Sequence, residues 1–377
     1  MNTIDQKTKK QTRHLDAVVV GAGQAGLAAA YHLKRQGANV LVVDGNARTG
    51  DNWRSHWDSL RLYSPAVHDD LPGLPFPADP HSFPTRDEVA DYLETYAATF
   101  DLPVRHSSPV RRLSRENDAF VVECPDVRYT ADNVIVATGT FGRSPKIPAF
   151  GADLDPQIVQ LHSSEYRNPD QLRPGRVLVV GASHSGADIA IEVVRSHETV
   201  LCGRDTGALP VRPGTRRFRL VFPLVWQMWG LVQTIRTPIG RRMKAQVRAH
   251  GAPLLRVTSA DLTAAGVERV TERMIGAQGG NPVVGTQQLP GIANVIWCTG
   301  SRRDDSWIDL PVIGDDGWPR EERGVVPTMP GLYFTGVAFQ YSFRSMLIGG
   351  AGADAEYVVN HLLSRRSERD ALPAPAA

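Results

Sequence analysis

Two stretches of the chain share one pattern of hydrophobic and polar positions. Each begins with a short β-branched run, at residues 15–20 and 176–180, that leads directly into a glycine-rich turn. A stretch with helical periodicity follows, and a second apolar run comes after it, at residues 39–44 and 199–204. Strand, glycine turn, helix and strand in this order predict a βαβ unit with parallel strands and a right-handed crossover. The chain therefore contains two such units.

Between the two units the pattern changes. Residues 109–136 alternate apolar and polar positions in three pieces, which predicts an antiparallel β meander. The sequence thus predicts an α/β fold of two Rossmann-like dinucleotide-binding domains plus a meander. We place the first domain in two pieces, residues 1–142 and 291–377, and the second between them at residues 143–290.

The first glycine turn, Gly21-Ala-Gly-Gln-Ala-Gly26, has the spacing of a pyrophosphate-binding turn. Gly21 permits the tight turn, Gly23 lets a pyrophosphate approach the backbone, and Gly26 lets helix and strand pack closely. An acid at the end of the second strand can accept hydrogen bonds from a ribose diol. The residues expected to bind the cofactor here are Gly21, Gly23, Gln24, Ala25, Gly26, Asp44 and Gly45.

The second turn keeps the first and last glycine but has Ser183 at the middle position. Arg204 follows Gly181 at the offset at which Asp44 follows Gly21. A cation there suits a 2′-phosphate, which favours NADPH over NADH; the alternative is a solvent-exposed loop arginine. The residues expected to bind this nucleotide are Gly181, Ser183, His184, Ser185, Gly186 and Arg204.

A flavin and a nicotinamide fit this arrangement better than two nicotinamides, because the enzyme needs a hydride donor and an electron acceptor that stays bound. The site with the acid is then the FAD site. The three cysteines, Cys124, Cys202 and Cys298, stand far apart inside apolar runs, and the chain has no C-x-x-C pair. We interpret them as small buried hydrophobic residues. No histidine spacing suggests a metal centre.

Several longer stretches point to one family. The two glycine turns, Gly50-Asp-Asn-Trp-Arg54, Asp58–Pro65, Leu161-His-Ser-Ser-Glu-Tyr166 and Gly331-Leu-Tyr-Phe-Thr-Gly336 resemble the flavin-containing monooxygenase-like group of class B flavoproteins, especially its compact bacterial and YUCCA-like branch. The resemblance covers roughly residues 15–363. It implies that Asn52, Trp53 and Arg54 lie beside the flavin and that His162 and Tyr166 belong to a signature between the domains.

The resemblance also names the remaining candidate residues. It implies catalytic roles for Arg54, His162 and Tyr166. It implies cofactor contacts from strand ends and from the start of the last helix, whose dipole would face the flavin, at Thr138, Gly139, Thr299, Gly300, Gly336 and Leu347.

The implied activity is an NADPH-dependent FAD monooxygenase. It would insert one atom of O2 into a small lipophilic or soft-nucleophile substrate through a flavin C4a-hydroperoxide. The missing thiol pair argues against a disulfide reductase. A reductase or dehydrogenase without oxygen transfer, and a redox-responsive regulatory flavoprotein, are the alternatives.

Residues 206–260 form a segment of unusual composition. They contain ten Lys or Arg residues and no acid, and Leu220–Ile235 is apolar. Three interpretations are open for 216–248: a lid over the substrate channel, a membrane-surface contact, and a homodimer contact. Nucleic acid is not an expected partner. The chain has no run of about 20 apolar residues that could span a membrane, and we expect a cytoplasmic location.

Overall fold

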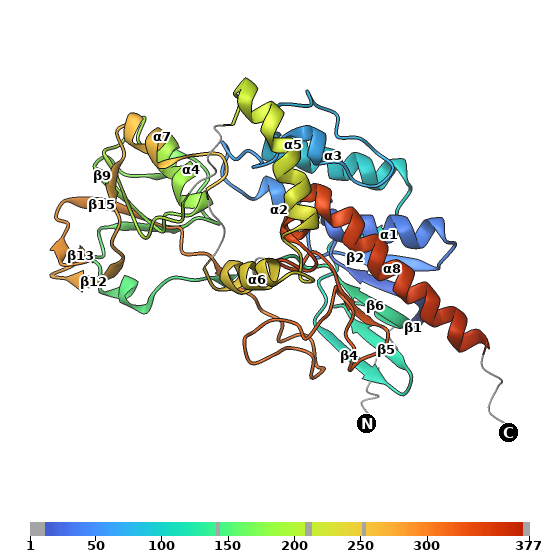
Figure 1. The fold of residues 1–377 in the computed structure, drawn as a ribbon. Coiled ribbons are helices and arrows are strands. Elements are labelled where there is room, and N and C mark those ends of the chain that lie inside the picture. Colours follow the sequence, from blue (N-terminus) through green and yellow to red (C-terminus); the bar gives the residue numbers. More distant parts are fainter. Residues whose placement is uncertain (1–11, 141–143, 208–212, 251–253, 372–377) are drawn as a thin grey trace, which may run out of the picture.

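The computed structural model describes residues 12–140, 144–207, 213–250 and 254–371, and it shows two sheet-centred units side by side (Figure 1). The predicted α/β class is confirmed. Each unit has a parallel sheet whose central strands are buried, as expected for sheets that are covered on both faces.

The first unit contains both a parallel sheet and the predicted meander. Its strand order is β3–β2–β1–β6–β5–β4, and β17 also pairs with β6. β1, β2, β3, β6 and β17 are parallel, whereas β4, β5 and β6 pair antiparallel. The strands are β1 Thr12–Val20, β2 Val40–Val43, β3 Val104–Arg105, β4 Arg112–Glu116, β5 Ala119–Glu123, β6 Arg128–Val136 and β17 Leu332–Phe334.

Three helices complete the core of this unit. α1 (Gln24–Arg35) buries a face of small residues against the sheet and packs along α8 (Ile348–Ala371). α3 (Arg86–Thr99) begins with a capping box. The Thr85 side chain accepts the backbone N–H of Glu88, and the Glu88 side chain accepts the backbone N–H of Thr85. The start of α8 at Ile348 agrees with the expectation that the last helix starts near Leu347.

The second unit is a five-stranded parallel sheet in the order β11–β10–β9–β15–β8. Its strands are β8 Val159–His162, β9 Arg176–Val180, β10 Thr199–Cys202, β11 Glu268–Val270 and β15 Ile292–Trp297. Helices α4 (His184–Val193) and α7 (Ser259–Ala264) accompany it. A small antiparallel sheet comprises β12 Met274–Gln278, β13 Asn281–Val284 and β14 Gln287–Gln288.

The domain boundary predicted at residue 291 is wrong by one strand. β15 lies between β9 and β8 in the second sheet, so the second unit extends to about residue 300. The two connections between the units, β7 (Ser144–Pro145) and β16 (Ser301–Arg302), pair antiparallel with each other. β15 completes the second sheet because its apolar residues are buried on both faces, which only the centre of a sheet allows.

The basic, apolar segment leaves the second unit and returns to it at one place. The Leu254 N–H donates to the Gly207 carbonyl, 2.9 Å away. Its helices α5 (Arg216–Leu231) and α6 (Pro238–His250) pack against the first unit instead of the second (Figure 1). The Ile235 N–H donates to the Tyr341 carbonyl, and Phe218, Phe222, Trp226 and Trp229 of α5 cluster with Phe339 and Phe343.

A buried ion-pair cluster fixes α6. The Glu321 side chain has no exposed surface, and its Oε1 lies 3.2 Å from Lys244 Nζ and 3.0 Å from an Arg248 nitrogen. Its Oε2 accepts the Gly324 N–H at 2.9 Å. Because both cations come from α6, the carboxylate connects this helix to the first unit.

We expect Glu321→Gln to destabilise the protein by about 3 kcal/mol, because two partly buried cations lose their counter-charge. Urea unfolding followed by far-ultraviolet circular dichroism measures this loss. The matched control is Asp309→Asn, which breaks the exposed pair with Arg112 and should leave the unfolding midpoint nearly unchanged. Equal midpoints for both variants would contradict a connecting role for Glu321.

Candidate active site

The first glycine turn follows β1 at the carboxyl edge of the sheet. Gly21 has φ +108°, and a Cβ there would lie 2.6 Å from the Ala137 carbonyl oxygen. A Cβ on Gly26 would lie 1.9 Å from the Gly21 oxygen. These two glycines are therefore required by the close packing of strand, turn and helix. At Gly23 a Cβ would meet nothing within 4 Å, so the protein itself does not require this glycine. An open approach to the backbone at this position is what a pyrophosphate needs.

Asp44 joins the second strand to this turn. Its buried carboxylate accepts the Ala22 N–H at 2.6 Å and the Asn46 N–H at 2.7 Å. Each carboxylate oxygen has two lone pairs, so the group keeps capacity for a ribose hydroxyl. The residues of this turn thus fit a bound dinucleotide.

Other strand ends converge on the same turn. Thr140 Oγ1 donates to the Gly336 carbonyl at 2.8 Å, and a Cβ on Gly336 would lie 2.9 Å from the Ala25 side chain. The predicted residues Thr138, Gly139 and Gly336 therefore lie together beside α1. Leu347 directly precedes α8.

The second turn repeats this construction. Gly181 also has φ +108°, and its Cβ would lie 2.3 Å from the Cys298 carbonyl oxygen. A Cβ on Gly186 would lie 1.7 Å from the Gly181 oxygen. Ser183 is the N-cap of α4, and its side chain makes no capping hydrogen bond. The two turns thus have the same packing, with β15 in the second unit in the place of β6 in the first.

Arg204 lies in the loop after β10, where its side chain is exposed. Beside it, the Arg269 guanidinium donates to the carbonyls of Leu201 and Gly203, at 3.0 and 2.5 Å. Arg269 therefore fixes the end of β10 through backbone contacts, and the Arg204 side chain extends from that fixed end.

Arg54 and Trp53 belong to α2 (Asp51–Arg54). The Arg54 guanidinium donates to Asp91 at 2.7 Å, to Glu94 at 2.9 Å and to the Thr49 carbonyl at 2.9 Å, which connects α2 to α3. Trp53 packs against the cores of both units, and its buried Nε1 has no hydrogen-bond partner. A buried N–H of this kind fits a cofactor with acceptor oxygens or nitrogens.

His162 and Tyr166 both have protein partners. The His162 Nε2–H donates to the Gly300 carbonyl at 2.9 Å, and Nδ1 accepts the Ser164 N–H at 3.2 Å. The Tyr166 hydroxyl donates to Glu192 at 3.0 Å, and its ring is fully buried. Arg54, His162 and Tyr166, predicted together as catalytic, therefore each contact a different part of the framework.

A stacked pair connects the two units near the turns. The Tyr63 and His184 rings are stacked, with centroids 4.3 Å apart. Asp188 of α4, close enough to act electrostatically on Tyr63, lies 2.7 Å from Arg256, and burial raises the pKa of Asp188 to about 6. Burial also raises the pKa of Tyr63 well above its usual value. The sequence does not reveal these contacts, because 121 residues separate the two rings.

Asp69 is a second buried carboxyl group that the sequence does not reveal. Ser64 Oγ donates to its Oδ1 at 2.6 Å, whereas Oδ2 has no hydrogen-bond partner. Burial raises its pKa to about 8, so this carboxyl holds its proton at neutral pH. In the sequence, Asp69-Asp70 looks like an ordinary polar loop.

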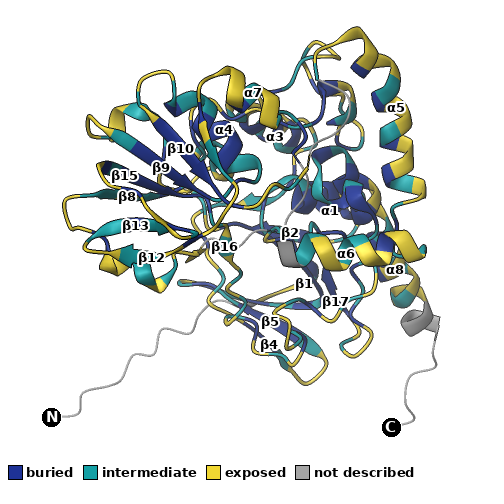
Figure 2. Ribbon diagram, turned by 60° about the vertical axis from the view of Figure 1, so that its left-hand side comes forward, coloured by how far each residue is buried: buried dark blue, intermediate teal, exposed yellow. Residues whose placement is uncertain are grey.

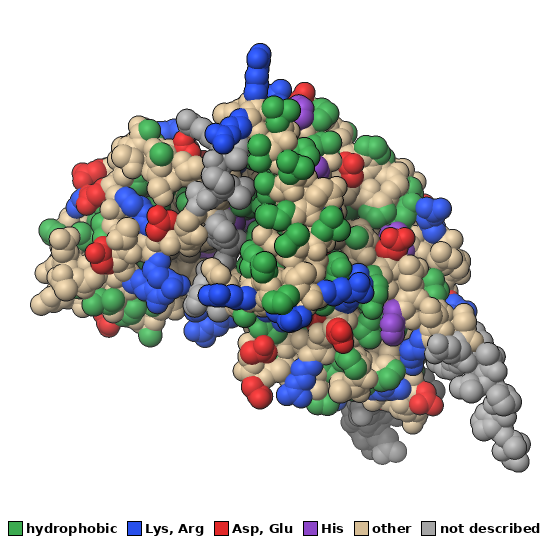
Figure 3. Space-filling view, viewed as in Figure 1, with side chains coloured by type: hydrophobic (Ala, Val, Ile, Leu, Met, Phe, Trp, Pro, Cys, Tyr) green, Lys and Arg blue, Asp and Glu red, His purple; other side chains and the backbone are tan. Residues whose placement is uncertain are grey.

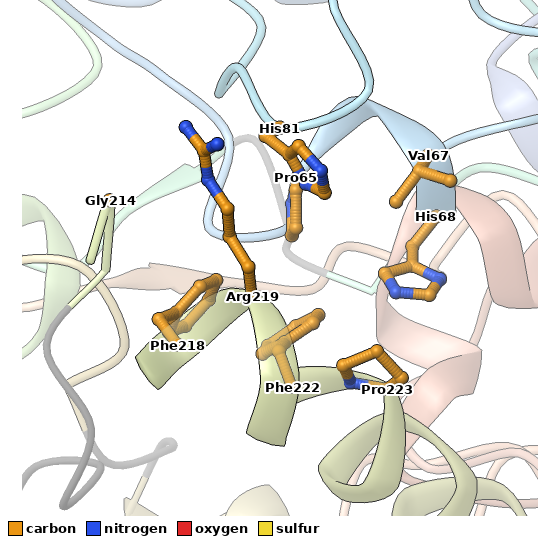
Figure 4. A pocket seen from close by; sticks show the side chains of 9 residues that line it. All are labelled: Pro65, Val67, His68, His81, Gly214, Phe218, Arg219, Phe222 and Pro223. Atoms are coloured by element: carbon orange, nitrogen blue, oxygen red, sulfur yellow. The ribbon is translucent and has the colours of Figure 1, made fainter. Parts of the chain in front are cut away.

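A small hollow lies where α5 meets the loop around Pro65 (Figure 4). Phe218, Phe222 and Pro223 line one side, with Val67, His68 and His81 across from them. Its cavity volume is about 30 Å3, room for about two water molecules. In this conformation the hollow is too small for an organic substrate.

All three cysteines are buried, and none of them forms a disulfide bond. Burial raises the pKa of Cys202 to about 11 and raises that of Cys298 further. A thiol with a raised pKa is a poor nucleophile, because the thiolate is the reactive form. Among the described residues no cluster of His, Cys, Asp and Glu has the arrangement of a metal site.

Two Rossmann-like units with glycine turns at the carboxyl ends of their parallel strands define an oxidoreductase with two dinucleotide sites. A family model described as pyridine nucleotide-disulphide oxidoreductase matches residues 18–211, and the chain belongs to this family. Within it the chain belongs with the flavin-containing monooxygenase-like members, as the sequence predicted. The protein is therefore an FAD-dependent oxidoreductase with a second site for a pyridine nucleotide.

Individual relatives agree with this placement. The chain is 36% identical to an uncharacterized CzcO-like oxidoreductase of Geobacillus kaustophilus, over 93% of this chain and 99% of that protein. It is 30% identical to the indole-3-pyruvate monooxygenase YUCCA1 of rice, over 52% of this chain and 49% of that one. A flavin-containing monooxygenase from Stenotrophomonas maltophilia superposes with TM-score 0.74 and 25% identity, covering 94% of this chain and 99% of that chain.

Within the described ranges, none of the helices is both long enough and apolar enough to cross a bilayer.

We expect Gly23→Ala to weaken FAD binding at least tenfold while the apoprotein keeps its thermal stability, because the new methyl group occupies only the open approach to the backbone. Fluorescence titration of apoprotein with FAD measures the affinity. Gly276→Ala is the matched control, since a Cβ at Gly276 also meets nothing within 4 Å. Unchanged FAD affinity in Gly23→Ala would refute the assignment of this turn.

Proposed function

We propose that this protein is an NADPH-dependent FAD monooxygenase that transfers one oxygen atom from O2 to a small lipophilic or soft-nucleophile substrate. One observation carries the coenzyme assignment: two turns of the same construction end in opposite charges. The first unit has the buried Asp44 after β2, and the second has the exposed Arg204 after β10.

The two charges suit different ribose substituents. A buried carboxylate accepts hydrogen bonds from ribose hydroxyls and repels a phosphate, which fits the adenosine ribose of FAD. An arginine at the same offset binds a 2′-phosphate in a bidentate, charge-assisted manner. NADPH is therefore the hydride donor that we assign to the second unit.

The role of the three residues predicted as catalytic follows from their contacts. Arg54 connects α2 to α3, His162 holds the Gly300 carbonyl, and Tyr166 is bonded to Glu192. We assign them as positioning residues that hold Trp53 and the second glycine turn in place. FAD, when bound, supplies the capacity to accept a hydride and to pass electrons to O2.

Oxygen is the electron acceptor that the protein's own residues favour. No cysteine of the chain is exposed, and burial raises the pKa of Cys202 and Cys298, so neither thiol suits disulfide exchange. The relatives named as monooxygenases support the same acceptor. The Tyr63–His184 stack would help to exclude water from the junction of the units.

Replacing Arg204 with Ala tests the coenzyme assignment. We expect kcat/KM for NADPH to fall roughly 10- to 100-fold while kcat/KM for NADH stays unchanged, because only NADPH loses a charge-assisted contact. Steady-state rates of coenzyme oxidation, measured with NADPH and with NADH, give both kcat/KM values. Arg195→Ala, an exposed arginine at the far end of α4, is the control and should change neither. An unchanged coenzyme ratio in Arg204→Ala would exclude the phosphate role.

Labelled O2 separates oxygen transfer from simple reduction. With methyl phenyl sulfide as a soft-nucleophile probe, we expect NADPH oxidation to yield sulfoxide that carries the isotope from O2, as mass spectrometry detects. Catalase in the assay removes the peroxide that could oxidise the sulfide without the enzyme. If all consumed NADPH appears as hydrogen peroxide with this and with a cyclic ketone probe, the protein is a reductase instead.

A further inference from the structure

We propose that α5 and the start of α6 form a docking face for a membrane surface that contains anionic lipids. The described part of the chain exposes nine large apolar side chains, and six of them lie between Leu220 and Ile239. They are Leu220, Leu224, Met228, Leu231, Val232 and Ile239. We call these six residues the apolar stripe.

The stripe is continuous because of helical spacing. Leu220, Leu224, Met228 and Leu231 follow one another at intervals of four, four and three residues, so they lie on one side of α5. Leu220, Leu224 and Leu231 are 78%, 71% and 72% exposed. Figure 2 shows the outward side of α5 as exposed, and Figure 3 shows hydrophobic side chains in a column along this helix.

The stripe is not the inner face of an open lid. The opposite side of α5 already packs through Phe218, Phe222, Trp226 and Trp229 against the first unit. Arg344 also holds the helix, since its Nε donates to the Trp226 carbonyl at 2.7 Å and its guanidinium lies over the Trp226 ring. Closing the helix further would not bury the leucines, because they point away from the surface that α5 covers.

Basic side chains stand at both ends of the stripe. Arg216, Arg217 and Arg219 lie at its beginning and Arg236, Arg241 and Arg242 at its end, and all six are exposed. Figure 3 shows Lys and Arg side chains at both ends of the hydrophobic column. Lys244, Arg248 and Arg256 of the same segment point inward to Glu321 and Asp188. The outward cations are therefore a separate set, and residues 213–260 contain no acid that could neutralise them.

This charge pattern favours an anionic membrane over a second copy of the chain as the partner of the apolar stripe. A second copy of the chain that paired stripe to stripe would bring basic ends onto basic ends in either direction, which like-charge repulsion opposes. An anionic bilayer complements the arginines, and its acyl boundary accepts the leucines. A 16-residue helix, about 24 Å long, can lie in the interface plane, as amphipathic basic helices do.

Vesicle sedimentation of the FAD-loaded protein tests the proposal. We expect the protein to bind phosphatidylcholine vesicles that contain phosphatidylglycerol, and we expect salt to weaken this binding. Binding to vesicles of pure phosphatidylcholine should be much weaker. Leu220→Ser with Leu224→Ser should lower the partition coefficient at least tenfold, because two large apolar side chains no longer enter the interface. Arg241→Gln with Arg242→Gln should lower it about fivefold per charge.

Matched controls keep the test specific. Ile275→Ser removes an exposed apolar side chain on β12, and Arg111→Gln with Arg320→Gln removes two exposed cations outside the segment. Both should bind vesicles like the parent protein. NADPH oxidation in solution should stay unchanged in every variant, which shows that the variants are folded.

Two results would overturn the proposal. One is equal sedimentation with anionic and neutral vesicles, or with none. The other is a dimer in analytical ultracentrifugation that Leu220→Ser with Leu224→Ser converts to monomer without any change in vesicle binding, which would assign the stripe to a second copy of the chain.

Discussion

The structure depends on the absence of a side chain at four positions. At Gly21 and Gly181 the backbone passes so close to the end of a neighbouring strand that a Cβ would lie within 2.6 Å of a carbonyl oxygen. Gly26 and Gly186 let the first turn of each helix press onto the turn before it. Because carbon and oxygen cannot approach so closely without repulsion, each unit can place a helix N-terminus at the carboxyl edge of its sheet only with glycine there. Both nucleotide sites follow from this single steric constraint.

The segment after β10 has to satisfy a different constraint. Its helix α5 has an aromatic side and an aliphatic side, and only one of them can pack on the protein. The aromatic side is buried against Phe339 and Phe343 of the first unit, although the segment is attached to the second. At α6, Lys244 and Arg248 form a buried ion-pair cluster with Glu321. The segment thereby connects the two units in addition to β7 and β16.

Much of the fold could be predicted from the sequence because its signals are local. Both glycine turns, the parallel strands beside them and the meander at residues 109–136 depend on neighbours within about 30 residues. The boundary at residue 291 was wrong because β15 joins the second sheet through pairing with strands more than 100 residues earlier. Asp69, Asp188 and the stacking of Tyr63 on His184 could not be predicted for the same reason: their burial and contacts arise from segments that only folding brings together.

The candidate site residues also differ in whether local sequence spacing identifies them. Gly23 and Asp44 are identified by spacing, and the geometry around them fits that identification. His162 and Tyr166 are identified by resemblance alone, and their polar atoms are occupied by Gly300 and Glu192. A group whose donors and acceptors are satisfied by the framework would have to break those bonds before it could act on a substrate. Both contacts lie within the second unit, where they fix the end of β8 to the end of β15 and to α4, the helix that follows the second glycine turn. The chemistry at the junction then falls to the cofactors and to a group that keeps unused hydrogen-bonding capacity there, the Trp53 N–H, whose ring packs against the cores of both units.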